Sequence, residues 1–417
     1  MAFWVFFYFF AFKLLLLHST MWYHILIIDF KEVTAMYTFS SLQKYLDTIL
    51  VREKIPGFDC KVMHKGREVF RYQGGFKDKE NQIPMKGDEL YMLYSASKPI
   101  TCTVGLRAME EGKFLMTHPL WWYLPEFKDV KVKRYDENGN LTLEPLKDDI
   151  RIHDIFNMTA GLNYDCGSKE IREAVKKNPK APTREIIKAI ASMNLDFQPN
   201  TRWQYSLCHD VVACLVEVAT GERFSDYVKR VIFEPLEMEA YYHATPELLP
   251  RIATQYQFDY SKNEPVLVEK KNAYIFGEEY DSGGAGVITS VDDYSKFAYA
   301  LTNYGLGANG ARILSKASVN LLRSNTLPVG SQPYKDFSSW MSNAEYGYGY
   351  GVRTKIGVGR GGNLTSIGEF GWDGAAGFLC SIDPEKQLTI VYAQQMLNPQ
   401  HDCTHNKIKN FVNQIIE

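Results

Sequence analysis

Ser95 and Lys98 stand three residues apart, and together they can provide a nucleophile and its base. A serine hydroxyl is a weak nucleophile until a neighbouring group accepts its proton. Side chains three residues apart share one face of a helix, so a helix running to Glu111 and closed by Gly112 would bring the lysine to the serine. Burial disfavours an ammonium ion, and a partly buried lysine can therefore act as the base. The pair predicts nucleophilic catalysis by Ser95.

Tyr205 is the next candidate for this chemistry, because the serine–lysine spacing alone is not specific. The same spacing occurs at Ser41 and Lys44, on the surface of the first predicted helix. Tyr205 lies in a turn ahead of the predicted helix Val211–Thr220. A phenol can both donate and accept a hydrogen bond. Tyr205 can therefore share the proton network of the serine and the lysine.

The segment 371–377 is rich in small residues and is expected on a strand. Bare backbone there lets a substrate lie close to the chain. The Ala375 N–H can then complete an oxyanion hole with the N–H of Ser95. The first turn of the helix after Ser95 adds unpaired N–H groups and a positive dipole end.

Histidines and cysteines favour structural roles in this chain. His209 and Asp210 follow Tyr205 closely and suggest a Ser-His-Asp triad, but a Ser-x-x-Lys centre needs no histidine, so we interpret Asp210 and His153 as structural. The nine histidines and seven cysteines include no HExxH and no CxxC pattern, so we expect neither a metal site nor a disulfide framework. No cofactor is implied, because the oxyanion hole and the Lys/Tyr pair can supply the electrostatics.

Hairpin patterns near both ends of the chain predict the scaffold. β-rich segments pair as 58–63 with 68–72, and as 377–382 with 387–394. Amphipathic helices are expected over Ser41–Lys54 and about 406–416. The fold class is therefore α/β (α+β), with an antiparallel sheet built from both termini and flanked by helices.

Length and composition limit the possible domain organisation and function of the protein. The 417 residues suffice for two domains, or for one domain with a large insertion. Residues 115–280 are richer in helical patterning (184–193, 211–220 and 224–232), so we expect an α-rich insertion packed against the sheet. The net charge of −2, without a basic run, argues against a nucleic-acid surface. The sequence leaves the oligomeric state open.

Residues 1–37 form a hydrophobic segment unlike the rest of the chain. Lys13 and His18 interrupt it, which makes it marginal for a span of about 20 residues. It is either a membrane anchor or sequence upstream of a start at Met36, and we favour the later start. A cytoplasmic location follows from that choice, and a membrane-anchored protein from the alternative.

Three ordered motifs resemble those of the serine β-lactamase-related superfamily, which includes class C β-lactamases, D-Ala-D-Ala peptidases and family VIII carboxylesterases. Ser95-Ala-Ser-Lys98 resembles the first motif of that superfamily. Tyr205-Ser206-Leu207 stands where its Tyr-x-Asn motif would be, and Trp372-Asp373-Gly374 where its Lys-Thr-Gly motif would be. The similarity covers about residues 40–417. It implies a β-lactamase/penicillin-binding-protein-like domain over 38–417 with the insertion at about 115–280.

The resemblance also implies a role for each site residue. Ser95 would be the acylated nucleophile, Lys98 its proton acceptor and Tyr205 the general acid/base. The N–H groups of Ser95 and Ala375 would form the oxyanion hole. Four further residues would contact substrate: Leu207, Trp372, Asp373 and Gly374.

Two departures from the family pattern affect the expected substrate. Leu207 replaces an asparagine that binds the substrate amide, and Trp372, followed by the anionic Asp373, replaces a lysine that binds a carboxylate. Each unpaired substrate group would cost about 1–3 kcal/mol. An uncharged ester needs neither partner, and an indole offers it a flat apolar wall. The expectation is a carboxylesterase for small or medium esters; the alternatives are a β-lactamase or D-amino-acid peptidase acting on amides, and a non-catalytic relative.

Overall fold

The computed structural model describes residues 38–341, 345–399 and 404–416. The hydrophobic segment predicted over 1–37 lies outside these residues. Within the described ranges, no helix combines the length and apolarity needed to cross a membrane.

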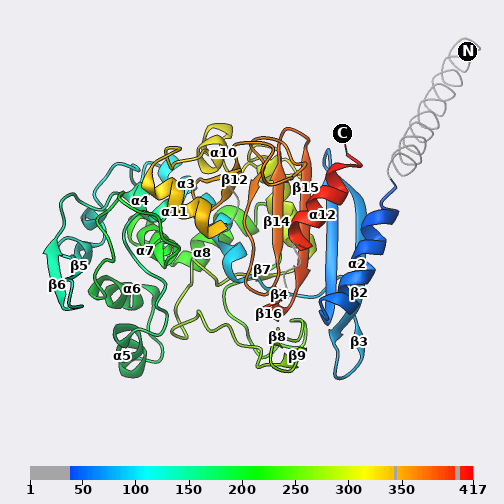
Figure 1. The fold of residues 1–417 in the computed structure, drawn as a ribbon, viewed down its shortest axis with the longest axis horizontal. Helices are drawn as coiled ribbons and strands as arrows, with labels where there is room; N and C mark the ends of the chain where they lie inside the picture. The colour runs from blue at the N-terminus through cyan, green and yellow to red at the C-terminus, as the bar shows by residue number, and fades with distance from the viewer. Residues whose placement is uncertain (1–37, 342–344, 400–403, 417) are drawn as a thin grey trace, which may run out of the picture.

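The central sheet is antiparallel and joins the two ends of the chain, as predicted. Its strand order is β11-β12-β13-β14-β15-β1-β2-β3, and β1 pairs with both β2 and β15. Figure 1 shows the blue N-terminal strands beside the red and orange C-terminal ones. The strands are β1 (Gly57–His64), β2 (Arg67–Asp78), β3 (Ile83–Pro84), β11 (Tyr346–Tyr348), β12 (Arg353–Lys355), β13 (Phe370–Gly371), β14 (Leu379–Asp383) and β15 (Leu388–Gln394).

The first hairpin is tight because of its turn residues. Lys65 and Gly66 both have positive φ, +50° and +77°. Two central residues with positive φ match the right-handed twist of the flanking strands. The predicted hairpin is therefore present, and its second strand extends beyond the predicted end at Tyr72 to Asp78.

Both faces of the sheet are buried. Along β15, Leu388, Ile390 and Tyr392 belong to one apolar cluster, while Val391 and Ala393 belong to another. Alternate residues of a strand point to opposite faces. The first cluster includes buried residues of helices α2 (Ser40–Arg52) and α12 (Thr404–Asn413), and the second includes those of α9 (Val291–Thr302).

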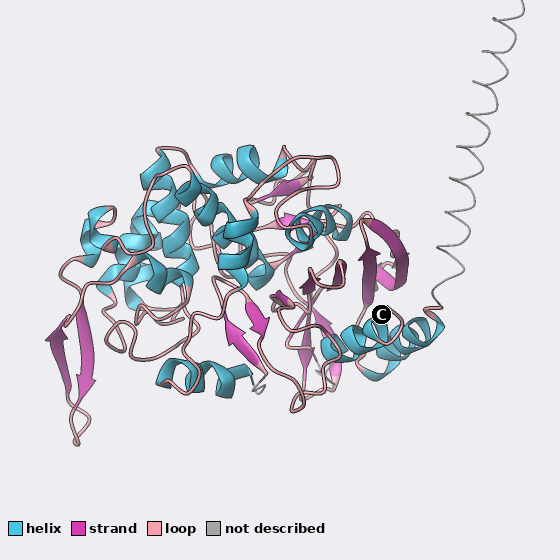
Figure 2. Ribbon diagram, turned by 90° about the horizontal axis from the view of Figure 1, so that it is seen from above, coloured by secondary structure: helices cyan, strands magenta, loops and turns pink. Residues whose placement is uncertain are grey.

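The helices of the middle of the chain gather at one end of the molecule, and the sheet lies at the other (Figures 1 and 2). Their bounds are α3 (Lys98–Glu110), α4 (Ile152–Phe156), α5 (Lys169–Lys177), α6 (Thr183–Ser192), α7 (Cys208–Thr220) and α8 (Phe224–Val228), with α10 (Lys316–Arg323) and α11 (Gln332–Met341) later in the chain. The helix predicted over 224–232 begins as α8 and continues as a π-helical turn over Lys229–Phe233. Apolar residues of these helices and of the α9 face of the sheet form one continuous core.

The region 115–280 also contains strands that the helical patterning did not predict. The hairpin of β5 (Lys131–Tyr135) and β6 (Leu141–Pro145) projects from the helical end of the molecule (Figure 2). Short strands make two small sheets, β4-β10-β7 and β16-β8-β9. Their bounds are β4 (Tyr91–Met92), β7 (Ala240–Tyr241), β8 (Tyr256–Asp259), β9 (Glu264–Leu267), β10 (Ile288–Thr289) and β16 (Met396–Leu397).

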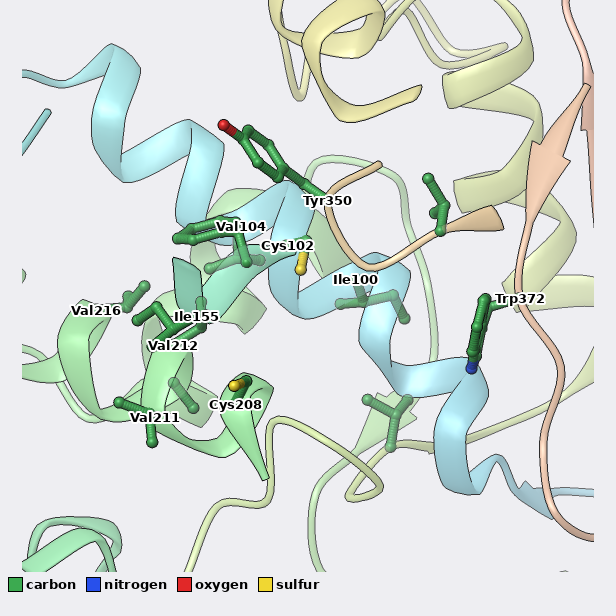
Figure 3. Packing of buried hydrophobic residues seen from close by; sticks show 14 of the residues in the cluster. Ile100, Cys102, Val104, Ile155, Cys208, Val211, Val212, Val216, Tyr350 and Trp372 are labelled. Carbon is green, nitrogen blue, oxygen red and sulfur yellow. The ribbon is translucent and has the colours of Figure 1, made fainter. Parts of the chain in front are cut away.

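Helices α3 and α7 lie in close contact beneath the candidate site. A Cβ at Gly105 would lie 2.5 Å from the Phe156 ring and 3.2 Å from Val212, so the glycine lets helices α4 and α7 approach α3. Figure 3 shows Ile100, Cys102 and Val104 of α3 facing residues of α4 and α7. This packing supports the helix that carries Lys98.

Candidate active site

Ser95 lies in a tight turn, Tyr94–Ser97, that leads directly into α3. Tyr94 has a φ of +49°, which a non-glycine side chain rarely adopts. Its buried hydroxyl donates a hydrogen bond to Gln255 Oε1 at 2.5 Å. This buried hydrogen bond holds the chain in its strained conformation before Ser95. Such strain persists only where the surrounding structure supports it.

Lys98 reaches Ser95 across one turn, as the spacing predicted. Its Nζ lies 3.1 Å from Ser95 Oγ and donates to the Gly284 carbonyl at 2.7 Å. The side chain is fully buried. Lys98 is therefore held on the nucleophile by a fixed backbone acceptor.

Asp210 organises the loop that provides this acceptor. Its Oδ1 accepts hydrogen bonds from Tyr280 Oη (2.6 Å), Ser282 Oγ (2.8 Å) and the Gly284 N–H (3.2 Å). A Cβ at Gly284 would lie 2.6 Å from Asp210 Oδ2, so only glycine fits there without a shift. The structural interpretation of Asp210 agrees with these contacts, which the sequence did not specify.

Tyr205 completes the contacts to the nucleophile. Its hydroxyl donates to Ser95 Oγ at 2.7 Å, and the Trp372 indole N–H donates to the same hydroxyl at 3.3 Å. The Lys98 Nζ lies 4.8 Å from the centre of the Tyr205 ring. A phenol and an amine thus converge on one serine oxygen.

A cavity of about 390 Å³ opens above Ser95. Its wall includes five aromatic side chains, those of Tyr164, Tyr205, Tyr274, Trp340 and Trp372. Trp340 and Trp372 lie parallel, with centroids 6.0 Å apart and an interplanar angle of 1°, and Trp340 also stacks on Tyr205 at 5.0 Å. Tyr164, Tyr274 and Trp340 were not predicted, because no local pattern distinguishes them from other aromatic residues.

Asp373 also lines this cavity, together with Arg353 and His405. Arg353 Nη1 donates to Asp373 Oδ1 at 2.9 Å, and His405 Nδ1 lies 3.4 Å from Asp373 Oδ2. Burial alone would raise the pKa of Asp373, but the Arg353 guanidinium and His405 hold it well below its usual range. A cation therefore lines the cavity although Trp372 replaces the lysine of the family motif, because strand β12 brings Arg353 there.

Gly374 and Ala375 lie in a turn rather than on the predicted strand. Strand β13 ends at Gly371, and the Gly377 N–H donates to the Gly374 carbonyl at 2.9 Å. The chain turns here because Gly377 adopts a φ of +93°. Ser95, Gly374 and Ala375 line the same cavity.

Leu207 is separated from the other predicted site residues. It caps the start of α7, where its side chain is buried in the core and its N–H donates to the Asn163 carbonyl. It is not among the residues that line the cavity. An apolar side chain at this position packs inward, away from the substrate contact expected of it.

His209 packs beneath the site and makes no triad. Its Nε2 lies 3.0 Å from the Phe156 carbonyl, and the ring is fully buried. Burial, with the nearby charge of Lys98, lowers the pKa of His209 from 6.5 to about 3. In the part of the chain that the structure describes, no cluster of three or more His, Cys, Asp or Glu could hold a metal ion.

Replacing His209 with glutamine should flatten the acid limb of the stability profile. The unfolded chain binds a proton at this histidine below about pH 6.5 while the folded protein does not, so the wild type loses stability as the pH falls from 6.5 towards 3. This group alone accounts for about 2 kcal/mol by pH 5. Urea unfolding of both proteins between about pH 7 and pH 5 measures the difference; equal slopes would contradict the expected titration.

Comparison with known proteins places this geometry among relatives. A family model described as Beta-lactamase matches residues 42–413. Esterase EstB of Burkholderia gladioli is 30% identical over 278 residues, covering 60% of this chain and 67% of the relative.

Two solved structures share the fold over nearly their whole length. EstCE1, a hydrolase with promiscuous acyltransferase activity, aligns with a TM-score of 0.71 and 20% identity over 90% of this chain and 97% of its own. Simvastatin synthase from Aspergillus terreus aligns with a TM-score of 0.75 and 21% identity over 91% and 98%. The predicted β-lactamase/penicillin-binding-protein-like fold is confirmed.

Proposed function

Since the chain belongs to the Beta-lactamase family, we propose that it is a serine hydrolase that forms an acyl-enzyme on Ser95 and acts as a carboxylesterase on small or medium esters. One observation carries the proposal. The Tyr205 hydroxyl and the Lys98 amine both contact Ser95 Oγ, at 2.7 and 3.1 Å, below a cavity with an aromatic wall. A serine with two proton-transfer partners is equipped for nucleophilic attack.

Acylation begins when Lys98 accepts the hydroxyl proton and Ser95 Oγ attacks the ester carbonyl. The negative charge on the carbonyl oxygen is bound by the N–H groups of Ser95 and Ala375. Tyr205 protonates the departing alcohol, which leaves the acyl group on Ser95. In the second step Tyr205 deprotonates a water molecule, which attacks the acyl carbonyl. As the bond to Ser95 Oγ breaks, Lys98 returns its proton to that oxygen and the acid is released.

Two motif positions support an ester rather than an amide substrate. Trp372 occupies the motif position of the family lysine and directs its indole N–H to Tyr205. Leu207 leaves no amide side chain at the second motif. The relatives named as esterase and hydrolase, EstB and EstCE1, agree with this preference.

Hydrolysis of a β-lactam or a D-amino-acid amide is the second candidate function. Arg353 favours it, because its guanidinium faces the cavity and can attract a substrate carboxylate. Asp373 opposes it, because its carboxylate already pairs with Arg353. We therefore rank this function below ester hydrolysis.

A paired assay distinguishes these functions. Protein beginning at Met36 is given p-nitrophenyl acetate, p-nitrophenyl butyrate and nitrocefin, and the butyrate reaction is quenched for mass spectrometry. We expect ester turnover at least about 100-fold faster than nitrocefin turnover, which is the cost of about two unpaired substrate groups, and one butyryl group on the peptide that contains Ser95. Faster nitrocefin turnover would select the second function, and a folded protein that stays unacylated would indicate a non-catalytic relative.

A further inference from the structure

His405 bridges the two ends of the turn that carries Ala375. Its Nδ1 lies 3.4 Å from Asp373 Oδ2, and its Nε2 lies 3.1 Å from the carbonyl oxygen of Gly377. The turn is also closed by backbone hydrogen bonds, including Gly377 N–H to Gly374 C=O. The imidazole is a side-chain link from helix α12 across both ends of the turn.

The ring is held by polar contacts as well as by packing. Both of its nitrogens face oxygen atoms, one of them on the Asp373 carboxylate. The other oxygen of Asp373 accepts from Arg353 Nη1 at 2.9 Å. The His405 side chain is 17% exposed and meets the Tyr392 ring at 67°. The link is therefore largely shielded from solvent and from screening by salt.

The turn has few side chains of its own with which to fix its direction. Its inner residues are Gly374, Ala375 and Ala376. A Cβ at Gly374 would lie 2.3 Å from the Leu93 carbonyl, so the turn is pressed against the segment that leads to Ser95. An oxyanion donor acts only when it lies about 2.7–3.1 Å from the developing charge. A small tilt of this turn would therefore weaken the Ala375 donor.

We propose that His405 is a positioning residue for the oxyanion hole. By holding Asp373 and Gly377 together, it directs the Ala375 N–H towards the oxygen of the tetrahedral intermediate. The inference rests on the proposed acyl-enzyme function of Ser95, and it gives the C-terminal helix a part in catalysis without contact to the reacting atoms.

His405→Leu removes both contacts and keeps an apolar side chain in the space. We expect kcat for p-nitrophenyl butyrate to fall about 10- to 100-fold while KM changes less than about threefold, because the oxyanion forms only in the transition state. The inhibition constant of butylboronic acid, which mimics the tetrahedral oxygen, should rise by a similar factor. His405→Gln keeps one N–H donor and should recover part of kcat.

Asn410→Ala is the matched control on the same helix. Asn410 accepts from the Leu364 N–H and donates to the Gly362 carbonyl, so this variant loosens α12 from another loop. It should leave kcat and boronate binding unchanged. An equal loss of kcat in Asn410→Ala would assign the effect to helix docking and overturn the proposal.

Amide hydrogen exchange tests the link without substrate. In the peptide covering 373–378, exchange should be about tenfold faster in His405→Leu than in the wild type or in Asn410→Ala. Unchanged exchange would overturn the proposal, whether or not the wild type hydrolyses esters. A wild type without ester turnover would refute only the proposed function. A rise in KM at constant kcat would also overturn it, because His405 would then bind substrate. If His405→Leu does not fold, the same readouts on His405→Gln decide.

Discussion

Ser95→Ala should lower kcat/KM for p-nitrophenyl butyrate by roughly 10⁴- to 10⁶-fold. The variant has no oxygen that can take the acyl group, while the cavity and the backbone N–H of residue 95 remain. Lys98 keeps its acceptor, the Gly284 carbonyl, at 2.7 Å. The protein should therefore fold normally, and circular dichroism and thermal unfolding would verify this.

Ser41→Ala is a suitable control for that experiment. Ser41 begins the other Ser-x-x-Lys pattern of the chain, and its side chain is exposed on helix α2. Its replacement should leave ester turnover unchanged. Retention of more than about a tenth of the activity in Ser95→Ala would place the nucleophile elsewhere and refute the proposed mechanism.

Tyr205→Phe should lower kcat about 10²- to 10⁴-fold, the usual loss for a general acid–base group. Phenylalanine keeps the ring that contacts Trp340 and Trp372 but loses the hydroxyl that donates to Ser95 Oγ. Stopped-flow measurement of p-nitrophenol release would separate acylation from deacylation, and both steps should slow.

Tyr227→Phe controls for the loss of a tyrosine hydroxyl. Tyr227 belongs to helix α8, and its hydroxyl donates to Glu111 Oε2 at 3.0 Å, within a different set of contacts. This variant should keep its kcat. A Tyr205→Phe enzyme with wild-type kcat would show that Lys98 alone handles the protons.

Local rules were sufficient where neighbours in the chain are neighbours in space. Ser95 and Lys98 meet because helix geometry brings residues three apart together. The first hairpin follows from residues at its turn that accept positive φ. Tyr205 was found because its motif could be compared with a family, not because a tyrosine is distinctive.

Long-range contacts account for what the sequence did not reveal. Arg353 comes from β12, Trp340 from α11 and His405 from α12, and only the assembled fold brings them to one cavity. The periodicity of hydrophobic residues in a sequence cannot predict such long-range contacts. The strand predicted over 371–377 gives way to a tight turn after Asp373, which still pairs with Leu379, because small residues suit a turn as well as a strand.

The pairing of β1 with β15 has a consequence for how the protein forms during synthesis. Phe58 lies opposite Gln394 and His64 opposite Leu388, so the middle of the sheet needs a strand that is synthesised long after β1. Until then one edge of β1 stays open, and the apolar cluster of α2, β1 and β2 lacks the residues of β15 and α12. Pairing across such a separation is intrinsically slow. We therefore expect the nascent chain to be prone to aggregation until β15 pairs with β1, and a ribosome stalled before residue 388 would hold a chain without its central strand pair.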